Sequence, residues 1–379
     1  MELHSKIIKT ISRPRRLKNA LNNLISVAFE SSYQKAMLFT DRLVVIILVP
    51  LVAMLTHLFS KKHIQKKGIV LWSYRYSGDV DQESIEKICL RDTLKNYVNQ
   101  DLLCRFFYWD YNRPLLGLGI DFYLKTIRMQ PQIIIISSYN SRAYYQPPAW
   151  IFTLLKWQGV KVVGLWWDTC SEGFADSIGK ILHSIDVHVI MENPLLRFAP
   201  TAVGATLARK SVAAFSPFDP MQSLNRSRDI EVAFFGQTGD YRGVRRKYLN
   251  YLLDSGVPLY YSAYSKDQQC TQEEYYEILK KSKIGINFSM SVSGHQLKAR
   301  VFEVMHSGAM LLEERNDQIA VYFTEDLDYV AFSNEKEMLE KIQYYLEHNE
   351  ERELIARNGY LKVRSEFTGK QFWDKVLIQ

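Results

Sequence analysis

One short stretch of the sequence gathers four side chains that could contact a phosphorylated ligand: His295, Lys298, Arg300 and Glu303. Lysine and arginine offer cationic donors for phosphate oxygens, and the arginine presents them in a planar fork. A carboxylate can accept two hydrogen bonds from a ribose diol, and a histidine can donate to a phosphate or a sugar hydroxyl. The structural alternatives are an Arg300–Glu303 ion pair on an ordinary helix and a solvent-facing turn histidine. Spacing alone favours the ion pair.

The residues around these four predict a helix that begins near Gly294. Ser293 and Gln296 have the S-x-x-Q spacing of a capping box, and Gly308 lies where a C-terminal cap belongs. The apolar run before them, residues 283–290, has the pattern of a buried strand. A helix that starts just past the carboxyl end of a strand offers free N–H groups and the positive end of its dipole to an anion.

A glycine-rich loop in the same half of the chain supplies further candidates. Gly236 ends a predicted strand, and Gly239 and Gly243 come before or at the start of the next predicted helix. Such a loop brings backbone N–H groups close to a ligand, although this one matches neither a P-loop nor G-x-G-x-x-G. Its place at the switch from strand to helix is what makes it a candidate. The possible ligand contacts in and after the loop are Gly236, Thr238, Arg242 and Arg245.

Asp168 is a separate candidate in the first half of the chain. It ends a predicted strand directly after Trp166 and Trp167. Its carboxylate could orient or deprotonate an acceptor hydroxyl. It could equally cap the helix expected near Glu172, and capping is the preferred interpretation.

Strand and helix patterns alternate along most of the chain in two series, which predicts an α/β fold of two tandem Rossmann-like domains with parallel sheets. We place an N-terminal domain at 68–205, a C-terminal domain at 206–370 and a crossover end at 371–379. Ligands of such sheets bind outside the carboxyl ends of the strands. The predicted strands are 68–74, 104–111, 132–139, 160–168 and 187–192 in the first series, and 231–236, 258–264, 283–290, 309–314 and 329–333 in the second.

The net charge of +7 is concentrated at the N-terminus. Residues 1–67 hold 12 Lys/Arg and three acids, a local charge of +9, which leaves −2 for residues 68–379. The folded body is therefore close to neutral, which disfavours a nucleic-acid partner. The four cysteines form no C-x-x-C pair, which indicates neither a zinc site nor a disulfide framework and fits a reducing compartment.

Residues 43–59, LVVIILVPLVAMLTHLF, form a uniformly apolar run inside this basic region, with Pro50 near its middle. The run starts too late for a cleavable signal. A single span, a re-entrant or in-plane segment, and a buried helix of the soluble body are the three alternatives. Basic residues on both sides favour attachment to an anionic membrane surface, with the folded domains in the cytoplasm. The topology of the segment stays open.

Three segments resemble group 1 glycosyltransferases of the GT-B fold, and most closely the spore-maturation-type subgroup. The resemblance covers about residues 230–370. WWDT at 166–169 also resembles the strand end found in the first domain of that subgroup. The segments are FFGQTGDYRGVRRKYL (234–249), RVFEVMHSGAMLLEE (300–314) and EMLEKIQYYLEHNEERELIARNGYLKVRSEFT (337–368).

The resemblance implies a nucleotide-diphosphate sugar donor on the C-terminal domain and an acceptor against the N-terminal domain. Glu303 corresponds to the ribose-binding glutamate of the family, and His295 stands where an E-x7-E pair would place the other glutamate. Family members usually need no metal or other cofactor, because cationic side chains and helix dipoles stabilise the leaving diphosphate. The resemblance also implies retention of anomeric configuration and a last helix that crosses back to the N-terminal domain, anchored by Phe372 and Trp373.

These observations lead to a metal-independent, hexosyltransferase-type enzyme at the cytoplasmic face of a membrane. It would act on a glycan, lipid-linked or protein acceptor in surface polysaccharide or glycoconjugate biosynthesis. Asp168 and His295 are its candidate catalytic residues. The alternatives are a sugar-nucleotide epimerase, for which the sequence offers no obvious acid and base pair, and a non-catalytic structural or carbohydrate-binding protein with the same fold.

Overall fold

The computed structural model describes parts of the chain from residue 68 onward. The predicted basic region 1–67, including the hydrophobic segment 43–59, lies outside the described residues. Among the helices that are described, none combines the length and apolar character needed to cross a membrane. The described residues are 68–73, 90, 93–98, 104–108, 126, 131–137, 149–166, 178–179, 181–190, 209–211, 227–236, 238, 243–262, 272–291, 294–295 and 297–377.

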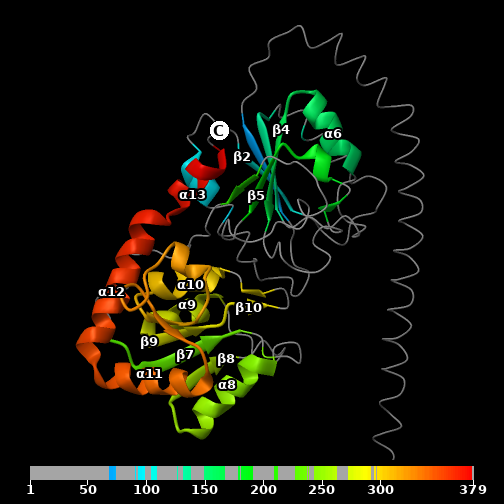
Figure 1. The fold of residues 1–379 in the computed structure, drawn as a ribbon. Helices are drawn as coiled ribbons and strands as arrows, with labels where there is room; N and C mark the ends of the chain where they lie inside the picture. The colour runs from blue at the N-terminus through cyan, green and yellow to red at the C-terminus, as the bar shows by residue number, and fades with distance from the viewer. Residues whose placement is uncertain are drawn as a thin grey trace, which may run out of the picture.

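Six parallel strands form the first sheet, in the order β2-β1-β3-β4-β5-β6 (Figure 1). Continuous apolar runs such as that of β3 are almost wholly buried, as a parallel sheet covered by helices requires. β6 pairs with β5, so the first sheet continues past the domain boundary expected at residue 205. The strands are β1 (Ile69–Ser73), β2 (Cys104–Tyr108), β3 (Ile133–Ser137), β4 (Lys161–Trp166), β5 (Val187–Ile190) and β6 (Arg209–Ser211).

Helix α6 (Ala149–Trp157) covers part of this sheet beside β4 (Figure 1). Its residues Ile151 and Phe152 are fully buried in an apolar cluster with strand residues such as Val162. The short 3-10 helix η3 (Leu182–Ser184) precedes β5. The predicted strands of this half are therefore confirmed.

The second sheet has five parallel strands in the order β13-β12-β9-β7-β8. Numbered within its own domain, each sheet begins 2-1-3-4-5, an order of doubly wound α/β domains. Two tandem α/β domains with parallel sheets are thus confirmed. The strands are β7 (Ile230–Phe235), β8 (Leu259–Ser262), β9 (Ser282–Asn287), β12 (Met310–Glu314) and β13 (Val330–Phe332).

Helices surround the second sheet and continue into the C-terminal end of the chain (Figure 1). The side chain of Asn334 caps one of them by accepting a hydrogen bond from the Glu337 N–H at 2.9 Å. A 3-10 turn, η7 (Ile319–Val321), follows β12. The helices are α8 (Gly243–Asp254), α9 (Gln272–Lys281), α10 (Ala299–His306), α11 (Glu335–Glu347), α12 (Asn349–Glu366) and α13 (Gly369–Leu377).

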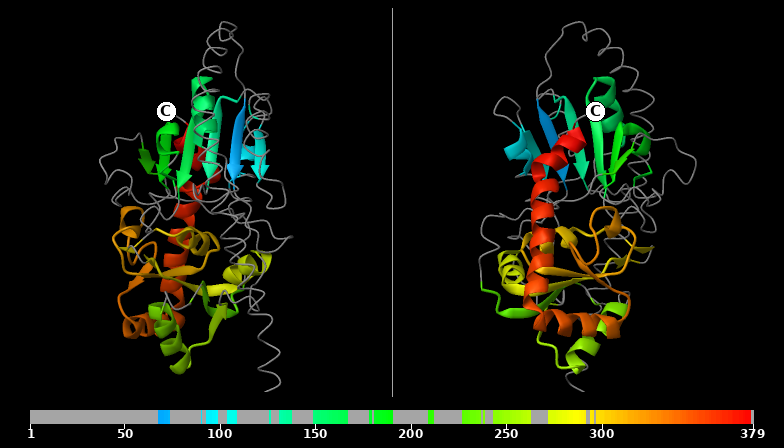
Figure 2. Two further views of the ribbon diagram at one scale, coloured as in Figure 1. Left: turned by 90° about the vertical axis from the view of Figure 1, so that its right-hand side faces the viewer. Right: turned by 60° about the vertical axis from the view of Figure 1, so that its left-hand side comes forward.

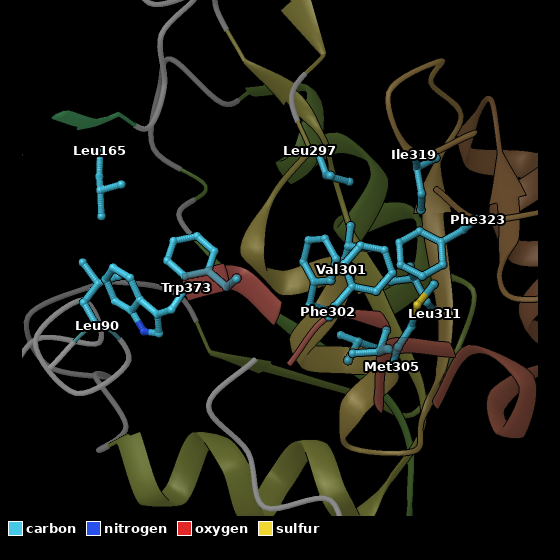
Figure 3. Close-up of a cluster of buried hydrophobic side chains, with 14 of the residues drawn as sticks. Leu90, Leu165, Leu297, Val301, Phe302, Met305, Leu311, Ile319, Phe323 and Trp373 are labelled. Carbon is cyan, nitrogen blue, oxygen red and sulfur yellow. The ribbon is translucent and has the colours of Figure 1, made fainter. Parts of the chain in front are cut away.

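Helix α12 runs along the C-terminal domain, and α13 then lies against the N-terminal domain (Figure 2). Trp373 is fully buried and its indole N–H donates to Thr93 Oγ1 at 3.0 Å, while the Tyr97 hydroxyl donates to Asp374 Oδ1 at 2.8 Å. Phe372 is also buried, so both aromatic residues lie where the expected crossing requires. One apolar cluster includes Trp373 and Leu90 as well as residues of α10 (Figure 3).

The predicted start of the helix at Gly294 is wrong, because α10 begins at Ala299. Gly294 and His295 instead form a short strand, β11 (Gly294–His295), which pairs antiparallel with β10 (Met290–Ser291). The N-cap of α10 is Lys298, whose extended backbone makes no side-chain capping bond. A capping-box spacing is only a local preference, and here Gly294 and His295, at the predicted start of the helix, pair with β10 instead.

Candidate functional site

The strand order of the second sheet reverses beside β7. The chain passes from β7 to β8 on one side and then returns to β9 on the other. The carboxyl ends of β7 and β9 therefore flank the switch point, where doubly wound sheets bind their ligands. Gly236 directly follows β7, and Asn287 ends β9. In the first sheet, the strand arrows point toward the C-terminal domain (Figure 2).

Gly236, which has no side chain, leaves room for a close approach by Arg300. Its φ of +152° is a conformation that L side chains rarely adopt. A Cβ added there would lie 3.1 Å from Arg300 Nη1 and 3.1 Å from the ring of Phe234. The guanidinium of α10 thus occupies the space beside the glycine, so the loop and the helix predicted to bind one ligand are in contact.

Glu303 lies one helical turn after Arg300 and is only 5% exposed. Its Oε2 accepts a hydrogen bond from the Tyr275 hydroxyl of α9 at 2.6 Å. Burial and the negative charge of Glu303 raise the pKa of Tyr275 well above its usual range, while Arg300 acts in the opposite direction. Carboxylate, phenol and guanidinium therefore form one cluster next to Gly236, and sequence reasoning had not included Tyr275.

Thr238, two residues after Gly236, makes its hydrogen bonds within its own domain. The Thr238 and Tyr261 hydroxyls share a hydrogen bond, and Arg246 Nε donates to the Thr238 carbonyl at 3.0 Å. Arg246 thus binds the backbone of Thr238, two residues after Gly236.

Arg245 binds backbone carbonyls in the structure. The side chain is 8% exposed, and its Nη2 donates to the carbonyls of Phe288 at 2.8 Å and Met290 at 3.3 Å. These carbonyls lie just beyond the end of β9. In this arrangement Arg245 supports the turn after β9, and a direct contact with a ligand stays a prediction.

The remaining predicted residues fall in two groups. His295 and Lys298 are half-buried and lie on β11 and at the N-cap of α10, so both precede the turn that carries Arg300. Asp168 and Arg242 lie outside the described residues, and their predicted roles are untested. Among the described residues, no group of three His, Cys, Asp or Glu side chains could hold a metal ion.

Glu313 is a buried acid at the same edge of the sheet that the sequence reasoning did not single out. It ends β12 with Glu314, and its carboxylate accepts hydrogen bonds from Asn287 Nδ2 at 2.8 Å and from the Ser289 hydroxyl. Burial raises the pKa of Glu313 to about 7, although these two hydrogen bonds lower it. The available signal was a pair of acids closing an apolar strand.

A family model described as "Glycosyl transferase-like" matches residues 221–377. No curated protein matches the chain. The matched segment contains the Gly236 loop, Arg300, Glu303 and Glu313, and it ends within α13.

Several solved glycosyltransferase structures resemble the chain over both domains. HepE of Anabaena, in complex with UDP and glucose, is 11% identical with a TM-score of 0.53, and the match covers 80% of this chain and 96% of HepE. Sucrose-phosphate synthase from Thermosynechococcus elongatus is 11% identical with a TM-score of 0.55, over 82% and 96%. The lipopolysaccharide outer core galactosyltransferase WaaB is 10% identical with a TM-score of 0.51, over 81% and 97%.

At these identities the structural likeness shows the fold alone. The family match concerns the C-terminal domain, and it agrees with the resemblance to group 1 enzymes at that level. The chain therefore has the α/β fold of GT-B glycosyltransferases, and its residues 221–377 match a family model described as glycosyl transferase-like.

Proposed function

We propose that the chain is a glycosyltransferase that takes a sugar from a nucleotide-diphosphate donor bound at the switch point of the second sheet. The observation that carries the proposal is the contact between Gly236 and Arg300, with Glu303 one helical turn further on. This contact places a cationic fork and a carboxylate beside a glycine loop at the expected edge.

Each group has a chemical task in this proposal. Arg300, Lys298 and the N-terminus of α10 bind the diphosphate and stabilise the charge that develops on it as the sugar leaves. Because Tyr275 donates to Oε2 of Glu303, the other carboxylate oxygen is the one offered to a ribose hydroxyl. No step in this scheme requires a metal ion.

The finer features of the reaction follow from the resemblance. Transfer of a hexose with retention is proposed, with His295 on β11 next to the donor sugar in place of a glutamate. An imidazole is a weaker acceptor than a carboxylate, so His295 would recognise the sugar hydroxyls differently. HepE binds UDP and UDP-glucose, which makes uridine nucleotides the first probes to use.

The acceptor is proposed to bind against the N-terminal domain, with Asp168 as the group that orients or deprotonates its hydroxyl. Residues 1–67, with their charge of +9, would hold the enzyme at the cytoplasmic face of a membrane. A membrane-borne glycan, a lipid-linked sugar or a protein would then be within reach, as in surface polysaccharide or glycoconjugate biosynthesis.

A non-catalytic carbohydrate-binding protein is the second candidate. The observation that favours it is the burial of Glu303, whose carboxylate already has a partner in Tyr275. A purely structural Glu303 would bind no ribose, so the two candidates differ in nucleotide binding.

Thermal unfolding of the whole 379-residue chain in mild detergent, with UDP, UDP-glucose, GDP and ADP as probes, tests the proposal. A ligand at 100 times its Kd stabilises the folded state by about 2.7 kcal/mol, which is a shift of several degrees. The glycine variant Gly236→Ala should lose this shift, because its Cβ would displace Arg300.

Gly256→Ala is the matched control. Gly256 also has positive φ, +76°, but a Cβ there meets nothing within 4 Å. This variant should keep the nucleotide shift while losing comparable intrinsic stability. A folded wild-type protein that none of the four nucleotides stabilises would overturn the transferase proposal and favour the second candidate.

A further inference from the structure

The hairpin that carries His295 is too short to hold its own place. β10 and β11 contribute two residues each, and their ladder consists of the pairs Met290–His295 and Ser291–Gly294. Even longer isolated hairpins are only marginally stable in water. The position of His295 therefore depends on what holds Met290, its partner across the ladder.

Arg245 holds the entry to this hairpin by its backbone. One guanidinium nitrogen donates to the carbonyls of both Phe288 and Met290, at 2.8 and 3.3 Å. The guanidinium carbon also lies 5.8 Å from the centre of the Phe288 ring, within the range of a cation–π contact. A side chain of α8 thus bridges the last residues before the hairpin.

Glu313 holds the same turn from the end of β12. Its Oε2 accepts from Asn287 Nδ2 at 2.8 Å, and its Oε1 accepts from the Ser289 hydroxyl. The neighbouring Glu314 accepts from the Met290 N–H at 2.9 Å. Each of the four residues 287–290 is therefore bound by a side chain of α8 or β12.

Arg245 and Glu313 bind the same turn from two different elements, α8 and β12. Glu313 is fully buried and Arg245 nearly so. A buried ion that loses its partners is strongly destabilising, so both side chains are restrained to the positions in which their hydrogen bonds are made. The positive charge of Arg245 lowers the pKa of Glu313, although burial is the larger effect and raises it.

We propose that Arg245 and Glu313 are positioning residues that hold the turn 287–290 and thereby set where His295 stands ahead of α10. The catalytic consequence rests on the proposed function. With His295 beside the donor sugar, loosening the turn lowers the rate of sugar transfer while nucleotide affinity changes little, because Arg300 and Gly236 lie outside the turn.

The hydrogen bonds between Glu313 and the turn 287–290 should depend on pH, because the carboxyl can be protonated. Glu314 raises its pKa and Arg245 lowers it, while Tyr329, whose own pKa is raised to about 12, stays neutral. An ionised carboxylate accepts from both Asn287 and Ser289, whereas the protonated form must use one oxygen as a donor. The ionised and protonated forms of Glu313 therefore hold the turn through different hydrogen bonds.

The test uses the whole chain labelled with carbon-13 in the histidine rings. The chain has eight histidines, and the His295 signal is assigned by its loss in His295→Gln. Glu313→Gln keeps the shape of the side chain and removes its charge, so it should move or broaden the His295 signal. The signals of His183 and His188, in the other domain, should stay unchanged.

A second variant and a control complete this measurement. Ser289→Ala removes one contact and should shift His295 in the same direction by less, which keeps the test decisive if Glu313→Gln does not fold. Asp328→Asn changes another buried acid of the same domain, one that accepts from the Thr324 N–H at 2.8 Å and pairs with Lys362 at 2.9 Å. This control should leave the His295 signal in place.

A functional measurement separates this inference from the proposed function. In Glu313→Gln, kcat for sugar transfer should fall by about tenfold while the Kd for UDP changes less than about twofold. A wild-type chain that binds no UDP would sink the proposed function, and the histidine signals alone would then decide whether the two side chains hold the turn. A His295 signal that moves no further in Glu313→Gln than in Asp328→Asn would overturn the positioning role.

Discussion

The two domains share the order of their first five strands but differ in the polar groups that they bury. In the N-terminal domain, Trp166 Nε1 donates to His188 Nδ1 at 3.0 Å, so the proton of the imidazole is on Nε2, 3.3 Å from the Leu182 carbonyl. Burial lowers the pKa of His188 to about 4, and the pair is neutral. Among the described residues, the Asp, Glu, Lys and Arg side chains that are buried lie in the C-terminal domain, and they include Arg245, Glu303 and Glu313.

Under the proposed function, this difference distinguishes the domain that would bind the donor. A neutral hydrogen-bonded pair lets a core close around the end of β4 without a charge to solvate. Buried charges are costly unless they are paired, so the three at the carboxyl edge of the second sheet are candidates for a functional role. The C-terminal domain is accordingly the side on which a diphosphate would be bound.

The largest expected effect is the loss of the link between the domains. Trp373→Ala should destabilise the protein by about 4 kcal/mol, because a fully buried tryptophan leaves a large cavity. Urea unfolding should then separate into two transitions, one for each domain. All seven tryptophans lie outside residues 206–370, so their fluorescence follows the N-terminal domain, and hydrogen exchange follows the C-terminal one.

Leu361→Ala is the control for this truncation, because Leu361 is an exposed leucine of α12. It should change stability by less than about 0.5 kcal/mol. A single transition retained in Trp373→Ala would contradict the role of α13 as the link.

Acid should weaken the N-terminal domain through His188. The unfolded histidine binds a proton below about pH 6.5, whereas the folded one stays neutral down to about pH 4. Stability should therefore fall as the pH drops through this window, by about 3 kcal/mol in all. Urea unfolding followed by tryptophan fluorescence measures it, and His188→Asn should remove the slope while the exposed His183→Asn retains it.

The C-terminal domain should respond to pH in the opposite direction, through Glu313. Its pKa is raised from 4.5 to about 7, so the folded state keeps a proton that the unfolded state has lost. Stability should fall as the pH rises from about 4.5 to about 7, by about 3 kcal/mol. Hydrogen exchange in peptides that cover 282–291 measures the effect, and a slope that survives in Glu313→Gln would assign it to another group.

The smallest expected loss of stability comes from a comparison of two tyrosine–glutamate hydrogen bonds. Tyr275→Phe leaves Glu303 buried without its donor and should destabilise the protein by about 2 kcal/mol. Tyr344→Phe removes a similar 3.0 Å hydrogen bond to Glu351, but Tyr344 is 41% exposed, and water replaces the donor. The control should cost less than about 0.5 kcal/mol in urea unfolding. Equal losses for both variants would mean that burial does not strengthen the Glu303 contact.

Sequence reasoning identified the strands of both sheets, because strand runs are local signals, and it named Gly236 and Arg300 as candidate ligand contacts without predicting that they meet. It misplaced the start of α10, because the pairing of Met290 with His295 competes with the capping preference of Ser293 and Gln296. It could not find Tyr275 or the bonds of Glu313. Tyr275 lies 28 residues before Glu303, and Asn287 lies 26 residues before Glu313, each in another element of the fold.

The sequence by itself determined the α/β class, the two series of strands and the segment that matches glycosyltransferases, since these depend on periodicity and on short motifs. Only the tertiary structure decided which charges are buried and what they touch. Arg245 and Glu303 are both ordinary polar residues of helical segments in the sequence. In the fold, one binds the carbonyls beyond β9 and the other a phenol of α9, because side chains distant in sequence converge there and exclude water.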